Sequence, residues 1–271
     1  MTSLKMPQFH RQRYLLIILE RAGGSLLKTD LQQLLFLSQQ ETGLSYYDFV
    51  YYHSDYYSFQ AEADIELLCD IGWLNIRNQT IKLMSKPKAA LKNAELSAIT
   101  QFIQFDAKRE RKLITDDQKC APSHKKHAKV VFTIGYEGLS FEAYANQLIR
   151  HQVRLLCDVR KNPFSRKFGF SKRFLSRFLP ELGIDYLHIP DLGIPSEQRK
   201  ELNTESDYSR LFEAYRQTLP LKQDSLQLLL NEVEEYKRIA LTCFEKQPNF
   251  CHRHCVSDYL ETENRIKIIH L

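Results

Sequence analysis

The sequence contains no apolar run approaching the ~20 residues that span a membrane. Its first 13 residues lack the apolar core and the small-residue cleavage site of a signal peptide, so we expect a cytoplasmic protein without membrane contact. Six cysteines in 271 residues are too few for a disulfide scaffold, and they indicate core thiols, a metal site or a catalytic site. The shares of apolar and charged residues, 43% and 26%, exclude disordered and collagen-like chains.

Acidic residues are nearly absent from one segment. Between residues 150 and 177, Asp158 is the single acid among nine lysines and arginines, so this segment carries a net charge of +8. The whole chain carries +5, which leaves −3 for the remainder. A cluster of one sign favours an anionic partner, phosphate above all, and a basic surface loop without a ligand is the alternative.

The length and the residue pattern predict two domains joined by a linker. Residues 1–105 read as a winged-helix-like, mostly helical domain, in which three helices precede a hairpin with its turn at Asn78-Gln79. Residues 106–129 are polar and are predicted to form the linker. Winged helices bind DNA in some proteins and mediate docking or dimerisation in others, so a homodimer through this domain is one expectation. Its tyrosine-rich segment, residues 46–57, suits either base stacking or core packing.

Residues 130–271 predict an α/β domain with a Rossmann-like, mainly parallel sheet covered by helices. Strands that are almost wholly apolar and alternate with helices are typical of a parallel sheet buried on both faces. The five apolar runs are 130–135, 153–159, 184–190, 239–244 and 265–271. The helical stretches are 140–151, 172–182, 206–219, 224–236 and 255–263.

Polar side chains follow three of these expected strands, where ligands of open α/β sheets bind. They occur in Gly135-Tyr136-Glu137-Gly138, in Asp158-Val159-Arg160 and in Cys243-Phe244-Glu245, and Cys251-His252-Arg253 opens the last helix. Each group also has a structural reading. Asp158 and Arg160 point the same way from a strand and could pair with one another. Cys251 and His252 could be capping and packing residues, and Cys157 and Cys243 read as core thiols.

The segments TIGYEG, LLCDVRKNPFSRKFGFSKRFL, IDYLHIPDLG and CFEKQPNFCHRHCVSDYL closely resemble the family called domain of unknown function 488. The resemblance covers roughly residues 130–271, and several members carry a helical N-terminal extension. Members are often labelled as DNA repair proteins, although the family name declares that the activity is not established. Ile194 departs from the pattern, because relatives tend to have a second glycine there. The motif match carries over Tyr136, Glu137, Asp158, Arg160, Pro163, Ser165, Glu245, Cys251, His252 and Arg253.

These features lead to the hypothesis of a nucleic-acid- or nucleotide-processing enzyme, a hydrolase or lyase with a role in DNA repair, with DNA favoured over RNA. The candidate catalytic residues are Glu137, Asp158, Glu245, Cys251 and His252. The candidate phosphate- or nucleic-acid-binding residues are Tyr136, Arg160, Lys161, Ser165, Arg166, Lys167, Lys172, Arg173 and Arg253. Phosphate contacts would supply affinity, and carboxylates would act as general acid and base. No cofactor is predicted.

Three alternatives stay open. In the first, Cys251 is a nucleophile whose pKa is lowered by the helix N-terminus, His252 and Arg253. In the second, a non-enzymatic DNA-binding regulator senses a nucleotide through its α/β domain. The third is a metal site from Cys251, His252, His254 and Cys255. Adjacent helical residues point in different directions, which disfavours a four-ligand site from this segment alone, so no metal ligands are predicted.

Overall fold

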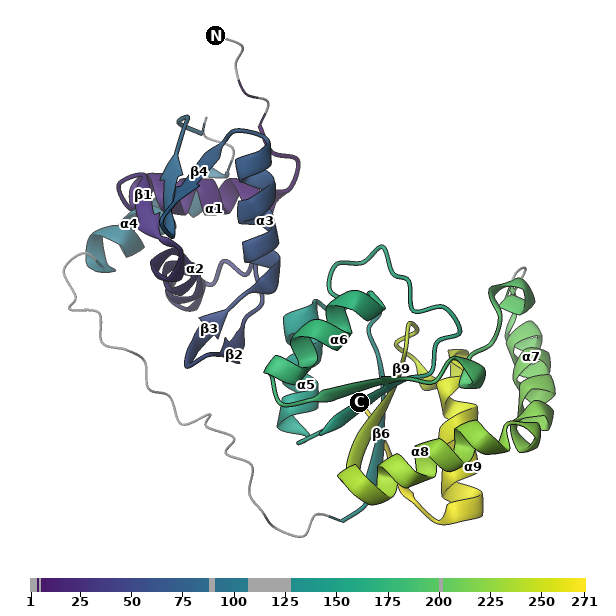
Figure 1. The fold of residues 1–271 in the computed structure, drawn as a ribbon. Coiled ribbons are helices and arrows are strands. Elements are labelled where there is room, and N and C mark those ends of the chain that lie inside the picture. Colours follow the sequence, from purple (N-terminus) through teal and green to yellow (C-terminus); the bar gives the residue numbers. More distant parts are fainter. Residues whose placement is uncertain (1–3, 5, 88–90, 107–127, 200–201) are drawn as a thin grey trace. The chain divides into compact units, whose positions relative to one another are not determined.

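The structure, a computed structural model, describes residue 4 and residues 6–87, 91–106, 128–199 and 202–271 (Figure 1). The chain divides into two compact units, residues 1–119 and 120–271. Most of the predicted linker, residues 106–129, lies outside the described residues. Within the described part of the chain, every helix is too short or too polar to cross a membrane.

Among its described residues, the N-terminal unit combines four helices with two small antiparallel sheets. A three-stranded sheet has the order β1-β5-β4, and β2 and β3 form a separate hairpin. The elements are α1 (His10–Arg21), β1 (Ser25–Leu27), α2 (Lys28–Thr42), β2 (Val50–Tyr52), β3 (Asp55–Tyr57), α3 (Phe59–Asp70), β4 (Leu74–Arg77), β5 (Thr80–Leu83) and α4 (Asn93–Asp106).

Two features of this unit bear on the sequence predictions. The hairpin turn lies at Asn78 and Gln79, as expected, and both have the positive φ that a two-residue hairpin turn requires (48° and 62°). The tyrosine-rich segment contributes to the core: Tyr47 is buried and donates a hydrogen bond to Asp64, and Tyr56 stacks on Phe36. Packing therefore accounts for part of this segment.

The second unit is an α/β fold with one fully parallel five-stranded sheet, which confirms the predicted sheet class. The strand order is β10-β6-β9-β7-β8. The elements are β6 (Val130–Gly135), α5 (Phe141–Arg150), β7 (Leu155–Asp158), α6 (Lys172–Glu181), β8 (Asp185–His188), α7 (Glu205–Thr218), α8 (Gln223–Tyr236), β9 (Arg238–Cys243), α9 (Arg253–Asn264) and β10 (Lys267–His270). Short 3-10 turns, η1 (Pro190–Leu192), η2 (Ser196–Arg199), η3 (Leu219–Leu221) and η4 (Pro248–Phe250), lie in the connections.

Helices cover both faces of this sheet. Helices α5 and α6 lie on one side, and α8 and α9 lie on the other (Figure 1). Neighbouring residues of a strand point to opposite faces, so Val131 joins a buried cluster with Leu229 of α8 and Leu260 of α9, whereas Phe132 faces away from it. This double burial explains why the strands read as apolar runs in the sequence.

Strand β9 positions the polar residues, because it lies between β6 and β7 and pairs with both. The parallel arrangement brings the segments after Gly135, Asp158 and Cys243 to one edge. The fit at this edge is tight: a Cβ on Gly135 would lie 1.9 Å from the carbonyl oxygen of Glu245. Gly135 is therefore needed for the close approach of two loops, whereas Gly138 supplies a positive φ of 78° in the turn that follows.

Candidate functional site

A buried ion pair lies at the end of β7. The Asp158 carboxylate accepts hydrogen bonds from Nε and Nη2 of Arg160, at 2.8 and 2.5 Å, and from the Tyr186 hydroxyl at 2.7 Å. Nη1 of Arg160 donates to the Tyr136 hydroxyl and to the carbonyl of Phe170. Burial opposes the charge of Arg160, but its hydrogen bonds with Asp158 outweigh this and raise the pKa of the guanidinium.

This network corrects two expected roles. Asp158 is fully buried and Arg160 is 5% exposed, so neither side chain lies open to a ligand. The pairing that the sequence left as an alternative is the one that the structure contains. Arg160 donates its hydrogen bonds to Asp158, Tyr136 and Phe170. It therefore holds the loop after β7 against the sheet and does not present a free guanidinium to phosphate. Tyr136 is likewise buried and stacks on Phe170 with ring centroids 4.3 Å apart.

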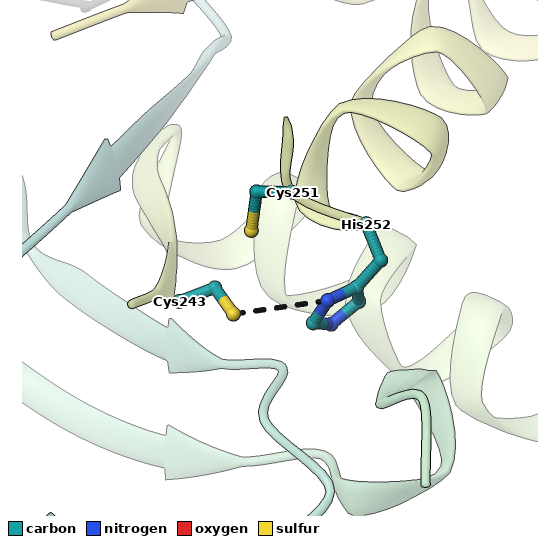
Figure 2. Close-up of side chains that lie close together, drawn as sticks. All are labelled: Cys243, Cys251 and His252. Carbon is teal, nitrogen blue, oxygen red and sulfur yellow. Dashed lines mark hydrogen bonds between the residues drawn. The ribbon is translucent and has the colours of Figure 1, made fainter. Parts of the chain in front are cut away.

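A second cluster forms where β9 ends and α9 begins. The side chains of Cys243, Cys251 and His252 point toward one another across the loop that joins β9 to α9 (Figure 2). All three are buried, and their donor atoms lie within 4.8 Å of one another. His252 Nε2 lies 2.8 Å from the carbonyl oxygen of Val159, which can only accept, so Nε2 carries the proton. The Nδ1 lone pair then faces Cys243 Sγ at 3.7 Å.

The two thiols of this cluster differ in the direction of their pKa shifts. A hydrogen bond from Cys251 outweighs burial and lowers the pKa of Cys243 to about 7, with Arg199 and Arg253 adding to the effect. Burial and the neighbouring Cys243 raise the pKa of Cys251. The expected lowering of the Cys251 pKa is therefore wrong, because this side chain is enclosed and donates to a sulfur. The residue with the lowered pKa is Cys243, which the sequence indicated as a core thiol.

Two residues of the Cys-His-Arg-His-Cys segment serve other contacts. His254 turns away from the cluster toward Arg216, whose Nη2 lies 2.9 Å from His254 Nε2. Arg253 is fully buried and donates to the carbonyl oxygens of Glu245 and Lys246, so its burial does not support the expected phosphate contact. Its guanidinium instead fixes the loop that follows β9.

The two remaining candidate carboxylates lie at the same edge. Glu245 is mostly buried, forms an ion pair with Arg199, and has Oε2 3.4 Å from Cys243 Sγ. Glu137 is exposed, and it accepts a hydrogen bond from the backbone N–H of Lys246 at 2.9 Å. Both carboxylates thus border the loop after β9, and Glu245 is the one in contact with the Cys243–Cys251–His252 cluster.

The predicted cations that remain exposed lie between β7 and the first turn of α6. Lys161, Arg166, Lys172 and Arg173 are exposed, and Phe164 among them is 73% exposed. We call these five residues the basic loop. Lys172 Nζ lies 3.3 Å from His188 Nδ1, and Lys161 Nζ lies 3.4 Å from Asp191. For Arg166 and Arg173, the described residues offer no acidic partner.

Two predicted binding residues of this segment make internal contacts. Lys167 is half-buried and donates to the carbonyl oxygen of Tyr136 at 2.9 Å, and burial lowers its pKa. The Ser165 hydroxyl accepts from the backbone N–H of Lys167 at 3.1 Å. These contacts shape the basic loop, and they leave less of either side chain for a ligand.

A surface pocket adjoins the basic loop. Its lining includes Lys161, Asp191, Gln198, Tyr215 and Lys222. Burial, followed by the charge of Lys161, lowers the pKa of Lys222, whose ammonium group donates to the carbonyl oxygen of Asp191 at 2.7 Å.

Several residues of the site were missed from the sequence. Tyr186, Arg199 and Lys222 reach the site from β8, η2 and the turn before α8, and no local motif marks them. Cys243 had a signal, the Cys-x-Glu spacing at a strand end, but its apolar surroundings favoured a core thiol. At the departure from the family pattern, Ile194 is buried, while a Cβ on Gly193 would lie 2.1 Å from the backbone nitrogen of Lys161.

Comparison with known proteins gives one match. Residues 140–260 match the family described as Domain of unknown function DUF488. The searches of curated proteins and of solved structures found no match. The matched range contains Asp158, Arg160, Glu245, Cys251 and His252, so it includes both the buried ion pair and the cysteine–histidine cluster. Residues 140–260 of this chain therefore form a DUF488 domain.

Proposed function

We propose that the α/β unit binds a nucleic acid or a nucleotide by its phosphates at the basic loop and acts on it as a hydrolase or lyase. The observation that carries the proposal is the pair Arg166 and Arg173. Both are exposed at the carboxyl edge of a parallel sheet, and neither has an acidic partner among the described residues. Unpaired guanidinium groups at this edge favour a phosphate ligand, because they offer charge-assisted hydrogen bonds without first breaking an ion pair.

Phe164 supports a ligand that also carries bases. An aromatic side chain that is 73% exposed gains little from the core, and this one lies between Lys161 and Arg166. Nucleic-acid-binding surfaces combine backbone-contacting cations with aromatic rings on which bases stack. A stacked base contributes about 1–3 kcal/mol to binding in such surfaces. DNA ahead of RNA, and a role in DNA repair, belong to this proposal through the family resemblance.

The chemistry would come from the carboxylates at the same edge. Glu245 lies in the loop after β9, beside Cys243, and Glu137 accepts a hydrogen bond from Lys246 of the same loop. Positioned carboxylates act as general acid and base in the cleavage of glycosidic and phosphodiester bonds. Asp158 is better suited to a positioning role, because Arg160 and Tyr186 occupy its oxygens.

The regulator alternative is less well supported by the N-terminal unit. The order of helices and the antiparallel β1-β5-β4 sheet suit the winged-helix proposal, in which α3 would enter a DNA groove. However, α3 contains four acidic residues and no basic residue. DNA backbones repel such a helix, so we favour a non-DNA role for α3. A homodimer through this unit stays a prediction.

Binding is tested with a fluorescent single-stranded DNA, the matching duplex and an RNA of the same sequence, using the full chain. If Lys161, Arg166, Lys172 and Arg173 each contact one phosphate, log K falls with log salt with a slope of about −3 to −4. Arg166→Ala and Arg173→Ala should each reduce this slope by about 0.7–0.9. Phe164→Ala should weaken binding without changing the slope.

The matched control is Lys267→Ala, because Lys267 is an exposed cation at the opposite, amino-terminal edge of the same sheet. This variant should bind as the parent does. Absence of binding at ~50 mM salt, where such contacts are strong, would refute the proposal. So would equal losses in Arg166→Ala and Lys267→Ala.

Turnover is tested separately with Glu245→Gln. An enzyme using this carboxylate should keep its affinity for the nucleic acid and lose most of its rate. A regulator should keep binding and have no rate to lose.

A further inference from the structure

We propose that Cys243, Cys251 and His252 form a binding site for a thiophilic divalent metal ion, with Zn²⁺ as the best match. Two thiolates and one imidazole are a common ligand set for zinc, and sulfur ligands select against Mg²⁺ and Ca²⁺. The inference does not depend on the proposed function, because metal binding is measured without any substrate.

The distances suit a tetrahedral ion. Zn–S bonds of about 2.3 Å and Zn–N bonds of about 2.0–2.1 Å separate tetrahedral donor atoms by roughly 3.5–3.8 Å. Cys243 Sγ and His252 Nδ1 lie 3.7 Å apart, and all three donor atoms lie within 4.8 Å of one another. The thiols and the ring also point toward a common centre (Figure 2). A metal ion therefore needs only small side-chain movements.

The histidine is held as metal-binding histidines usually are. Its Nε2–H donates to the carbonyl oxygen of Val159 at 2.8 Å, which fixes the ring orientation and leaves the Nδ1 lone pair for a ligand. Val159 lies between Asp158 and Arg160, so the buried ion pair holds this carbonyl in place. Arg253 does the same for the loop between Cys243 and Cys251, through the carbonyl oxygens of Glu245 and Lys246.

Hydrogen bonding within the protein does not fully account for the cluster. Cys243 Sγ accepts from Cys251 and is close to two further groups that can accept a proton, His252 Nδ1 and a Glu245 oxygen at 3.4 Å, yet its thiol has one proton to donate. A cation at the centre interacts favourably with all of these lone pairs at once.

The charge balance also suits a buried site. Binding of M²⁺ displaces one proton from each thiol, and the two protons leave to solvent. The resulting unit of one M²⁺, two thiolates and a neutral imidazole has no net charge, which limits the cost of burial. Three protein ligands leave one position of a tetrahedral ion for an oxygen ligand such as water, and the nearby Glu245 carboxylate is balanced by Arg199.

The test uses the full chain purified under reducing conditions without chelators. We expect about one equivalent of zinc by elemental analysis, in line with a single three-residue site. After removal of the metal, Co²⁺ should produce thiolate-to-cobalt charge-transfer absorption and the intense visible bands of a tetrahedral site. Zn²⁺ should displace the Co²⁺ and abolish both signals.

Cys243→Ser, Cys251→Ser and His252→Asn should each reduce Co²⁺ affinity at least tenfold, whereas Cys255→Ser should keep it. Cys255 is the matched control, because it is an equally buried thiol only three residues beyond His252. If circular dichroism shows that a variant does not fold, the Co²⁺ spectrum of the unaltered chain decides whether the metal site exists. Absence of these cobalt bands in the reduced chain would overturn the proposal, as would a metal-free chain isolated with a Cys243–Cys251 disulfide.

Discussion

Replacement of Asp158 by asparagine should destabilise the α/β unit more than any exposed charge substitution. Asp158 is completely buried and Arg160 nearly so, and four hydrogen bonds link the carboxylate to the side chain and backbone of Arg160 and to Tyr186. Removing one partner of a buried pair leaves the other charge uncompensated, which costs about 3–5 kcal/mol. Arg160 keeps its contacts with Tyr136 and Phe170, so we expect the lower end, ~3 kcal/mol, or about 150-fold in the unfolding equilibrium.

The assay is urea unfolding of the full chain followed by two signals. Trp73 is the single tryptophan and is buried in the N-terminal unit, so its fluorescence reports on that unit. Far-UV circular dichroism reports on both units. Unfolding of the α/β unit changes the dichroism signal without changing tryptophan fluorescence. Asp158→Asn should shift this part of the dichroism transition to lower urea concentration.

Asp191→Asn is the matched control, because Asp191 pairs with Lys161 at the surface and should cost at most ~1 kcal/mol. The double variant Asp158→Asn with Arg160→Met should recover part of the loss, since it removes the unpaired charge. A loss of less than ~1 kcal/mol in the free energy of unfolding for Asp158→Asn would refute the reasoning, because an uncompensated buried guanidinium should destabilise the unit by more than that.

Three further outcomes are expected. Gly135→Ala should abolish metal binding or prevent folding of the α/β unit, since its Cβ would lie 1.9 Å from the Glu245 carbonyl oxygen. The cobalt spectrum and circular dichroism measure the two effects, and a variant with the same cobalt and dichroism spectra as the parent would contradict this prediction. Tyr186→Phe should cost about 1 kcal/mol in urea unfolding, because Asp158 loses one of its hydrogen bonds. Gln79→Gly should stabilise the N-terminal unit by ~0.5–1 kcal/mol, because the positive φ of 62° is unfavourable for glutamine. Urea unfolding followed by Trp73 fluorescence measures this stability, and a loss of stability would contradict the turn at Asn78 and Gln79.

The α/β unit could largely be predicted from the sequence because its strands are buried on both faces. All five apolar runs contain a strand of the parallel sheet. Strand β1 was not predicted, since its three residues, Ser25–Leu27, have no pattern of their own and pair with β5 far along the chain. The winged-helix assignment of the N-terminal unit stays a prediction.

For the candidate site, the location could be predicted more readily than the roles. Ligand-facing and buried arginines look alike in a sequence. Arg160 and Arg253 are buried because Asp158 and the carbonyl oxygens of residues 245 and 246 accept their hydrogen bonds, and these partners are brought together only by the fold. Cys243 was assigned to the core for a related reason: its strand neighbours are apolar, and the approach of Cys251 and His252 depends on the loop that Arg253 holds.

The central place of β9 has a consequence for synthesis of the chain. β6 and β7 emerge from the ribosome early, but each has β9 as its neighbour, and β9 ends only at Cys243. Until then, both strands have an open edge and apolar faces, a combination prone to pairing with other chains. The centre of the sheet therefore cannot be completed before Cys243 has been synthesised. Chains that stop before Arg238 should aggregate, and the nascent α/β unit should depend on chaperones far longer than its N-terminal neighbour does.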